Sequence, residues 1–298
     1  MNPKELIRTS LSHESFTVSH HRLPRFLNVW HYHQELELVY IKKSTGTIFI
    51  GDCIEQFSAG DLVFIGSCLP HLWLNDKAYF ERKDLTAEAM VIHFHPHCFG
   101  DKFFTIPEMH KIHKVMEEAK TGIRLEGTNK RKIISMIEGL FFENELSKVI
   151  SLLQILRLIA DASGKVFLSS HSFINAYAKN SNTKLDKVYE YILNNFKEEI
   201  NLNRTADLVH MNPSAFSRYF KQTTNKTFVQ FLNEVRIGYA CKLLMDQGDK
   251  NISEIAFECG YRNLSNFNRQ FKLITRKTPK DYLTSHHQAF TTPVSPNR

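Results

Sequence analysis

Histidine and acidic side chains alternate along a short segment in the N-terminal part of the chain. Successive side chains of a strand point to opposite faces, so an extended segment from His31 to Glu37 places two histidines and two glutamates on one face. Imidazole and carboxylate groups can bind a metal ion, exchange protons or hydrogen-bond to a polar ligand. Further along, Pro70–Asn75 adds a histidine and a tryptophan. The candidate ligand-binding residues are His31, His33, Glu35, Glu37, His71 and Trp73.

Two stretches near the C-terminus carry side chains that could read DNA bases. Each has two phenylalanines spaced as in a helix that buries one face, and it leaves serine, asparagine, arginine and lysine for the other face. Arginine can pair with guanine, asparagine with adenine and serine with several base edges, while lysine and arginine hold phosphates. The candidate DNA-binding residues are Pro213, Ser214, Ser217, Arg218, Lys221, Arg262, Asn263, Ser265, Asn266, Asn268, Arg269 and Lys272.

An internal repeat relates these two stretches. Ala206–Phe216 aligns with Ala256–Phe267, and the arginine, phenylalanine and lysine that follow align as well. The offset is 50 residues before a turn and 51 after it, which places one extra residue in the second turn. Because insertions are tolerated in turns and not inside helices, the alignment predicts two copies of one supersecondary unit.

Each copy has the layout of a helix-turn-helix. The first copy predicts a helix over 204–210, a turn in which Asn212 is the N-cap and Pro213 the first helical residue, and a second helix over 214–222. The second helix of such a unit enters the major groove, which is about 12 Å wide.

The second copy and the segment between the copies follow the same logic. Ser253 is expected to cap a helix over 255–258, Gly260 to supply the turn, and 264–273 to form the second helix. Phe228–Gln247 predicts one long amphipathic helix that links the copies. Two readers linked in this way would reach major-groove segments about 34 Å apart.

With these patterns in place, the C-terminal part resembles the AraC/XylS family of transcription regulators. The resemblance covers 211–244 and 252–283, with an alanine in each first helix, Phe-x-Arg-x-Phe in each second helix, Arg236 opening the linking helix, and Pro279–Tyr282 near the end. Thr205 replaces a usual apolar residue and Arg276 a usual glycine. The resemblance implies a promoter-binding regulator, most often an activator that engages RNA polymerase.

The N-terminal part has the composition of short strands followed by helices. Runs rich in β-branched and aromatic residues predict a small barrel or sandwich with strands over Leu36–Lys42, Thr45–Ile50, Asp61–Ile65 and Glu88–Phe94. Apolar residues at helical spacing predict helices over Ile106–Lys120, Thr128–Phe141 and Glu143–Ala162, with Asn144 or Thr128 as caps. The helices are expected to pack on the barrel. The last is more apolar than a solvated helix requires, which favours a dimer interface.

The histidine segments resemble the two sequence motifs of the cupin barrel, although Ser44, Gly66 and Cys68 depart from those motifs. In metal-dependent cupins the matching positions, here His31, His33, Glu37 and His71, bind a divalent metal. Regulators of the family usually use the barrel as a small-molecule pocket without metal. A third interpretation is that these histidines are structural, and all three remain open. No role is assigned to the further histidines His93, His95 and His97.

The excess positive charge of the chain lies in its C-terminal part. The net charge is +7, and residues 184–298 hold 17 Lys and Arg against 11 Asp and Glu, whereas residues 1–183 hold 21 against 20. This asymmetry is typical of a phosphate-facing domain beside a neutral one. We expect an α+β protein of two domains, with a cupin-like sensor barrel at 1–97, a helical dimerisation segment at 98–163, a linker at 164–183, a tandem helix-turn-helix domain at 184–287 and a loose tail at 288–298.

The remaining sequence features concern the cell compartment and the class of protein. Five scattered cysteines without a Cys-x-x-Cys pair indicate reduced thiols in a cytoplasm, and neither a signal peptide nor a membrane span is expected. The hypothesis is a cytoplasmic transcription regulator, an activator and not an enzyme, that needs no cofactor. It would bind duplex DNA as a homodimer under control of a small molecule such as a sugar or sugar acid. The alternatives are a metal-dependent cupin enzyme fused to a DNA-binding domain, and a DNA-binding protein whose barrel only dimerises.

Overall fold

The computed structural model describes residues 4–5, 14–76, 78–171, 173–175, 183–224, 226–245 and 250–284. The chain divides into two compact units, Met1–Thr183 and Lys184–Arg298. The first unit combines strands with helices, and the second is helical in its described residues. The architecture is therefore the two-domain α+β arrangement expected from the sequence. The predicted tail at 288–298 lies outside the described residues.

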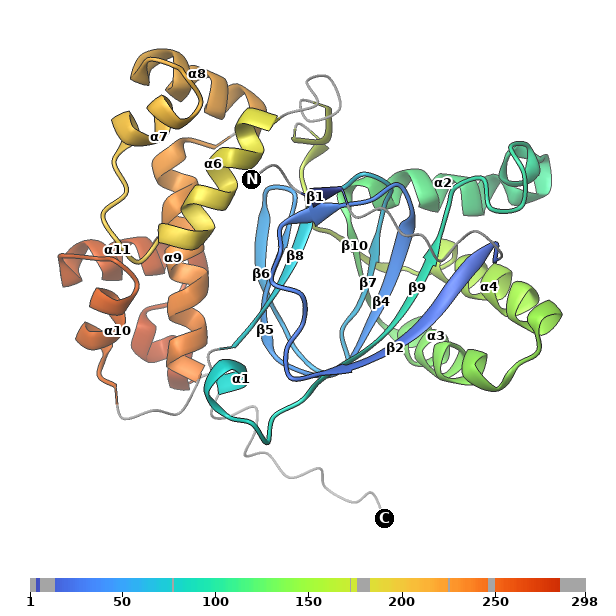
Figure 1. The fold of residues 1–298 in the computed structure, drawn as a ribbon. Coiled ribbons are helices and arrows are strands. Elements are labelled where there is room, and N and C mark those ends of the chain that lie inside the picture. The colour runs from blue at the N-terminus through green and yellow to red at the C-terminus, as the bar shows by residue number, and fades with distance from the viewer. Residues whose placement is uncertain are drawn as a thin grey trace. The chain divides into compact units, whose positions relative to one another are not determined.

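The N-terminal unit is built on two β-sheets (Figure 1). All strand pairs are antiparallel except β1 with β3. The four expected strands occur as β4, β5, β7 and β9. The five-stranded sheet has the order β1 (Lys4–Glu5), β3 (His31–Tyr32), β8 (His71–Asn75), β5 (Gly46–Ile50) and β6 (Cys53–Phe57). The six-stranded sheet has the order β11 (Gly164–Phe167), β10 (Ile123–Glu126), β7 (Leu62–Ile65), β4 (Leu36–Lys43), β9 (Ala87–Phe94) and β2 (Phe16–Leu23).

Side chains of the six-stranded sheet alternate between two environments. In β4, Leu36 and Leu38 belong to the apolar core that the sheet shares with the helices. Glu37 points the other way, toward the five-stranded sheet, because its carboxylate contacts His71 of β8. The space between the sheets is thus where the alternating histidine and glutamate side chains of the sequence meet.

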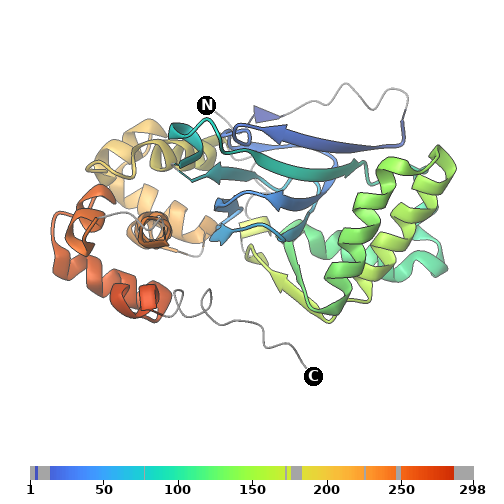
Figure 2. The same cartoon turned by 90° about the horizontal axis from the view of Figure 1, so that it is seen from below.

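Helices cover the outer face of the six-stranded sheet (Figure 2). Their buried side chains, such as Val115, Ile137 and Ile155, pack on this sheet. The backbone N–H of Ser147 donates to the Asn144 side chain at 2.9 Å, so Asn144 caps α4 as expected. The α-helices are α1 (Ala78–Glu81), α2 (His110–Glu118), α3 (Thr128–Gly139) and α4 (Glu145–Ala160), and the short 3-10 helices are η2 (Phe103–Thr105), η3 (Pro107–Met109), η4 (Ala119–Thr121) and η5 (Leu140–Phe142).

The first residues of the expected linker are part of the barrel. Gly164–Phe167 forms β11, which pairs with β10 along four residues at the edge of the six-stranded sheet. The segment was expected to be a linker because its sequence lacks a sustained period. The strand is short and its partner lies far away in sequence, so local periodicity could not reveal it.

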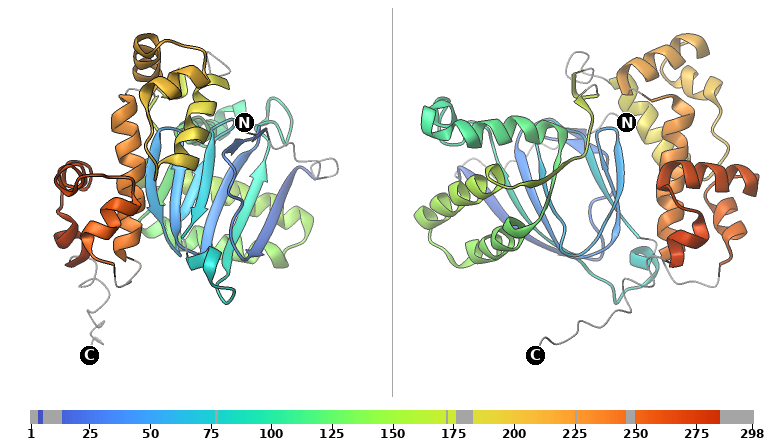
Figure 3. Two further views of the ribbon diagram at one scale, coloured as in Figure 1. Left: turned by 60° about the vertical axis from the view of Figure 1, so that its left-hand side comes forward. Right: turned by 180° about the vertical axis from the view of Figure 1, so that it is seen from behind.

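The C-terminal unit consists of helices arranged around one long helix, α9 (Figure 3). In the described residues α6, α7 and α8 precede α9, and α10 and α11 follow it; α8, α10 and α11 pack against it. Residues 279–284 add a further helical segment. The bounds are α6 (Thr183–Asn195), α7 (Leu202–Leu208), α8 (Pro213–Thr224), α9 (Phe228–Met245), α10 (Ile252–Glu258) and α11 (Leu264–Thr275).

The helix α9 is buried on more than the one face that the sequence predicted. Phe231 and Val235 lie on the expected face, but Ile237, Tyr239 and Cys241 on other faces are also buried. On the expected face, Phe231 packs on α6 and α8: its ring stacks on that of Tyr189 in α6, with centroids 4.5 Å apart, and contacts that of Phe220 in α8. The prediction of a single amphipathic face was wrong because α9 serves as the common core of both helix-turn-helix units.

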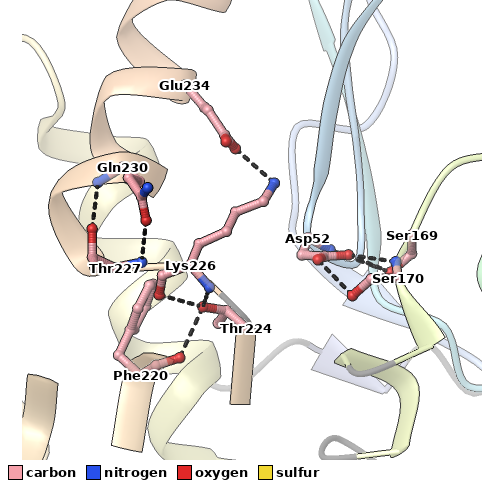
Figure 4. Close-up of polar contacts among 9 residues, drawn as sticks. All are labelled: Asp52, Ser169, Ser170, Phe220, Thr224, Lys226, Thr227, Gln230 and Glu234. Carbon is pink, nitrogen blue, oxygen red and sulfur yellow. Dashed lines mark hydrogen bonds and ion pairs between the residues drawn. The ribbon is translucent and has the colours of Figure 1, made fainter. Parts of the chain in front are cut away.

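The internal repeat is visible in the hydrogen bonds of the two copies. The Thr224 hydroxyl donates to the carbonyl oxygens of Phe220 and Lys226, and the Thr275 hydroxyl donates in the same way to those of Phe271 and Lys277 (Figure 4 shows the first set). The turns also match, since the N–H of Met211 donates to Ala206 O and that of Tyr261 to Ala256 O, each at 3.0 Å. Asn212 and Asn263, 51 positions apart, both cap the helix that follows. The extra residue of the second copy is therefore Arg262.

One predicted cap is wrong. Asn251, and not Ser253, caps α10: its side chain accepts the N–H of Glu254 at 3.0 Å, and the Glu254 side chain accepts the N–H of Asn251 at 2.8 Å. The helix starts earlier than expected, at Ile252, and the reciprocal pair is a capping box. Among the described residues, the structure has no helix with both the length and the apolar character needed to cross a membrane.

Candidate functional site

The second helix of the first copy, α8, exposes the side chains that the sequence selected. Phe216 and Phe220 are fully buried and fix the orientation of the helix. The opposite side is polar, and its cations carry no ion pair in the described residues. Pro213 opens the helix and is half-buried. The exposed candidates are Ser214, Ser217, Arg218 and Lys221.

The second helix of the second copy, α11, repeats this arrangement. Phe267 and Phe271 are fully buried, and the candidates on the other side are exposed, among them Ser265, Asn268 and Lys272. Arg269 donates to the Asn266 side chain at 3.0 Å, which holds its guanidinium on the outer face.

Two candidates of the second copy have structural partners that the sequence did not predict. The Asn263 side-chain oxygen accepts the N–H groups of Ser265 and Asn266, so only its amide N–H groups remain for a base. The guanidinium of Arg262 forms an ion pair with Glu199 on the surface. Both side chains stay exposed beside α11.

Residues that depart from the family pattern are accommodated by specific contacts. Thr205 is fully buried, and its hydroxyl donates to Asn201 O at 2.9 Å, so it fills an apolar position without an unpaired polar group. Arg276 ends α11 in the left-handed region, with φ of 61°, where glycine would be unstrained. Arg236 is structural: it donates to Phe196 O at 2.8 Å and Glu198 O at 2.7 Å.

In the barrel, four histidines and one glutamate converge between the two sheets; we call His31, His33, Glu37, His71 and His93 the histidine cluster. All five are buried. The Oε2 atom of Glu37 lies 3.1 Å from His33 Nε2 and 2.9 Å from His71 Nε2, and its Oε1 lies 3.3 Å from His93 Nε2. The rings of His31 and His71 are 4.3 Å apart.

The backbone fixes the orientation of three of these rings. Nδ1 of His31 lies 2.7 Å from Val29 O, and Nδ1 of His71 lies 2.8 Å from Leu69 O. Nδ1 of His33 lies 3.0 Å from the carbonyl oxygen of Glu35. A carbonyl oxygen only accepts, so each Nδ1 carries the proton, and in a neutral ring Nε2 keeps the lone pair that faces the cluster. Metal-ligating histidines are oriented by the same kind of outer hydrogen bond.

The carboxylate of Glu37 faces ring nitrogens that are acceptors when the rings are neutral. With neutral rings, the lone pairs of His33 and His71 would both face a carboxylate oxygen of Glu37, and no hydrogen would lie between them. Either a protonated ring or a metal cation resolves this conflict. The donor types and their mutual separation fit a divalent transition-metal ion. The groups His31, His33, His71 and His33, Glu37, His93 each bring their ligand atoms within 4.8 Å of one another.

The pKa values of His31 and Glu37 are those of metal ligands, a neutral imidazole and an ionised carboxylate. Burial, aided by the neighbouring His71, lowers the pKa of His31 to about 3, so this ring is neutral near pH 7 and its lone pair is available. Burial alone would raise the pKa of Glu37, but the adjacent His93, His33 and His71 lower it well below its usual value. Glu37 is therefore an ionised carboxylate inside the barrel.

His93 belongs to the histidine cluster, although no role was assigned to it from the sequence. His93 enters the cluster because β9 pairs with β4 so that His93 lies opposite Glu37. The alternation of His93 with His95 was the available signal, but the register that aims it at Glu37 is a long-range feature. Glu35 is buried with its carboxylate 3.5 Å from His33 Nδ1. Trp73 is on the same face of β8 as His71, but its ring packs on Phe57 with centroids 5.1 Å apart.

Comparison with known proteins supports the organisation of the C-terminal unit. Residues 205–285 match a family described as "Helix-turn-helix domain". An uncharacterized HTH-type transcriptional regulator of Staphylococcus aureus strain MRSA252 is 28% identical over 83% of this chain and 31% of its own length. An uncharacterized HTH-type regulator of Pseudoalteromonas carrageenovora is 36% identical over 35% of this chain and 61% of its own length.

A solved structure, that of a probable AraC family transcriptional regulator from Rhodopseudomonas palustris, is 23% identical and covers 34% of this chain and 95% of that one, with a TM-score of 0.33. The chain thus spans about a third of the Staphylococcus relative and less than two thirds of the Pseudoalteromonas one.

Proposed function

We propose, from the premise that the chain belongs to the AraC-type helix-turn-helix transcription regulators, that it binds duplex DNA through α8 and α11 and regulates transcription. The observation that carries the proposal is the repeated pair of helices that bury two phenylalanines and expose serine, asparagine, arginine and lysine. These side chains suit base edges on the inside of the groove and phosphates on its walls.

The two arginines occupy equivalent places in the repeat and define the expected contacts. Arg218 in α8 and Arg269 in α11 project from the faces opposite the buried phenylalanines. We assign them to base contacts, since a guanidinium can pair with guanine through two hydrogen bonds. Lys221 and Lys272, one turn further along, are assigned to phosphates. Asn266 holds Arg269 in place and can itself pair with adenine.

The experiment is selection of binding sites by the full chain from random duplexes, followed by affinity measurements at two salt concentrations. We expect a site with two contacted segments about ten base pairs apart. Arg218→Ala and Arg269→Ala should each weaken binding by roughly ten-fold or more and relax the preference at one base. The matched control is Arg157→Ala, which removes an exposed arginine of the other unit. Binding that depends on salt but has no sequence preference would refute the assignment.

The N-terminal barrel is proposed to be the sensor, with the histidine cluster as its effector site. The observation that favours a divalent metal ion as the occupant is the grouping of the donors, since three ligand atoms in each of two groups lie within 4.8 Å of one another. When bound, such an ion would supply a fixed positive charge that holds the rings together. His93 joins the four expected donors, and the donors form two groups of three that share His33, each compact enough to hold one ion.

Calorimetric titration of metal-depleted protein with Zn²⁺ and Ni²⁺ distinguishes the interpretations. A metal site predicts one ion per chain and a loss of affinity of roughly ten-fold or more in His93→Ala, with no change in the control His97→Ala, whose side chain is exposed. No binding of either ion would leave an organic effector, such as a sugar acid, or a structural cluster. Turnover of an added substrate by the loaded protein would instead support the cupin enzyme.

The helical segment between barrel and DNA-binding unit is proposed to form a homodimer. Phe142 and Leu146 are 93% and 71% exposed, and Ile150 follows one turn later on α4. An exposed apolar stripe of this kind marks an interaction surface. In the proposed organisation, residues 1–97 sense, 98–163 dimerise and 184–287 bind DNA, and the connection begins after Phe167 because Gly164–Phe167 is part of the barrel. Contact with RNA polymerase, and hence activation, belongs to the same proposal.

A further inference from the structure

The chain segment that follows the last strand of the barrel is fixed to the barrel by the buried carboxylate of Asp52 (Figure 4). Asp52 Oδ1 accepts the hydroxyl of Ser169 at 2.7 Å and the backbone N–H of Ser170 at 2.8 Å. Its Oδ2 accepts the hydroxyl of Ser170 at 2.8 Å. We call these three residues the Asp52 clasp. A carboxylate with three donors at these distances is a strong local restraint, because hydrogen bonds to a charged acceptor are the stronger kind.

The chain around the clasp is held just as closely. The N–H of Ser169 donates to Thr121 O at 2.7 Å, and the Ser170 hydroxyl accepts the N–H of Phe173 at 3.2 Å. Phe173 is fully buried. Gly51, beside Asp52, has no room for a side chain, since a Cβ there would lie 2.2 Å from the Ser169 hydroxyl and 3.0 Å from the Phe173 ring. The start of the connecting segment is therefore seated on the turn between β5 and β6.

The same turn is joined to the histidine cluster. The N–H of Gly51 donates to the carbonyl oxygen of Pro70 at 2.9 Å, and Pro70 directly precedes His71. Ile50 lies opposite His71 in the pairing of β5 with β8. The His71 ring is in turn held by its hydrogen bond to Leu69 O. One hydrogen bond and two peptide units thus separate the residue that carries a ligand atom of the cluster from the residue that holds the connecting segment.

We propose that the Asp52 clasp is the device that transmits occupancy of the histidine cluster to the connecting segment and so to DNA binding. This inference rests on the proposed sensor function. When His71 is held in its ligating position, Leu69–His71 and the turn at Gly51 are held with it, and the clasp stays closed. When the cluster is empty, Glu37 and the rings lose their common restraint, the turn gains freedom, and the segment from Ser169 onward is released. The closed clasp restricts the movement of the DNA-binding unit and the open clasp permits it, so the two states differ in their affinity for DNA.

The test uses the full chain, metal-depleted or loaded with Zn²⁺, and the variants Asp52→Asn and Ser170→Ala. Three quantities are measured: Zn²⁺ affinity, hydrogen exchange of the peptide that spans 164–175, and affinity for the selected duplex. In the wild type we expect Zn²⁺ to slow exchange of this peptide and to change DNA affinity by about ten-fold. Both variants should bind Zn²⁺ within about two-fold of the wild type, yet their DNA affinity should change by less than about two-fold on loading.

A matched control separates the clasp from a general loss of acidic charge. Asp161→Asn removes a carboxylate of the same unit that pairs with Lys111 on the surface, and it should retain the full Zn²⁺ response. Ser170→Ala keeps the proposal testable if Asp52→Asn does not fold, because it removes one donor and leaves the carboxylate in place.

The outcomes for the clasp and for the sensor are distinct. A variant that binds Zn²⁺ and still shows the wild-type change in DNA affinity overturns the clasp. A wild type whose 164–175 peptide responds to Zn²⁺ while its DNA affinity does not overturns the sensor function and leaves the local coupling standing. A wild type in which Zn²⁺ changes DNA affinity without any change in this peptide overturns the clasp and leaves the sensor function intact.

Discussion

The substitution Gly260→Ala probes the turn that aims the second DNA-reading helix. Gly260 has φ of +81°, and a Cβ built there would lie 2.6 Å from Phe196 O and 2.8 Å from Lys197 O. Both atoms are backbone oxygens of the loop that Arg236 also holds, so they cannot move aside cheaply. The change should therefore strain the backbone at residue 260 and displace the α10–α11 turn from α6.

The loss in free energy of unfolding has two contributions, one from the backbone conformation and one from the added methyl group. An L-residue with positive φ costs about 1–2 kcal/mol, of which roughly 0.4–1 kcal/mol is recovered because alanine narrows the unfolded ensemble. Forcing a methyl group against fixed backbone adds about 1–3 kcal/mol. The free energy of unfolding of the C-terminal unit should fall by about 1–5 kcal/mol in total. Gly60 supplies the control, since its φ of +95° is also positive but a Cβ there would meet nothing within 4 Å. Gly60→Ala should cost only about 1 kcal/mol.

Denaturant unfolding followed by two signals measures both variants. The two tryptophans, Trp30 and Trp73, lie in the N-terminal unit, so their fluorescence reports on Gly60→Ala. Far-ultraviolet circular dichroism reports on both units, and the part of its transition that does not coincide with the fluorescence change reports on Gly260→Ala. Equal costs for the two substitutions would refute the argument from the backbone oxygens. A cost near zero for Gly60→Ala would refute the argument from φ.

Four further changes follow from contacts described above. Arg276→Gly should stabilise the C-terminal unit by up to about 1 kcal/mol in thermal unfolding, because it relieves a φ of 61°; destabilisation would contradict this. Asn251→Ala should cost about 1 kcal/mol and Ser253→Ala much less, and the reverse order would mean that the capping box is misassigned. Since the pKa of His31 is lowered to about 3, the unfolded chain takes up its proton first as the pH falls below 6.5. The metal-depleted barrel should then lose on the order of 1 kcal/mol per pH unit down to about pH 3, and His31→Gln should flatten this slope in unfolding curves. Leu146→Glu should shift the protein from dimer to monomer in sedimentation, and an unchanged mass would exclude α4 from the interface.

The features that could be predicted from the sequence are those that depend on residues close together in the chain. The recognition helices followed from two phenylalanines four residues apart, and Asn212 as a cap followed from its place before Pro213. The alternation of His33 with Glu37 placed both on the inner face of the barrel. These are properties of a few neighbouring residues, and the structure retains them.

The features that escaped prediction depend on distant pairing. His93 joins the histidine cluster only because β9 is in register with β4, and β11 exists only because β10 lies beside it. The side chain of Asp52 gave no signal in the sequence, because its partners Ser169 and Ser170 lie more than a hundred residues further along the chain. Periodicity within a segment cannot show which strands become neighbours.

The burial of α9 on several faces has a consequence for the DNA sites that such a protein can accept. A helix that is buried against both helix-turn-helix units cannot bend or change its length without disturbing both cores, so it keeps a fixed distance between the two recognition helices. Each base pair added between the two contacted segments rotates the second one by about 35° around the duplex. Two recognition helices held at a fixed distance tolerate substitutions in the DNA between the contacted segments but not changes in its length. The operator should therefore be defined by phase as much as by bases.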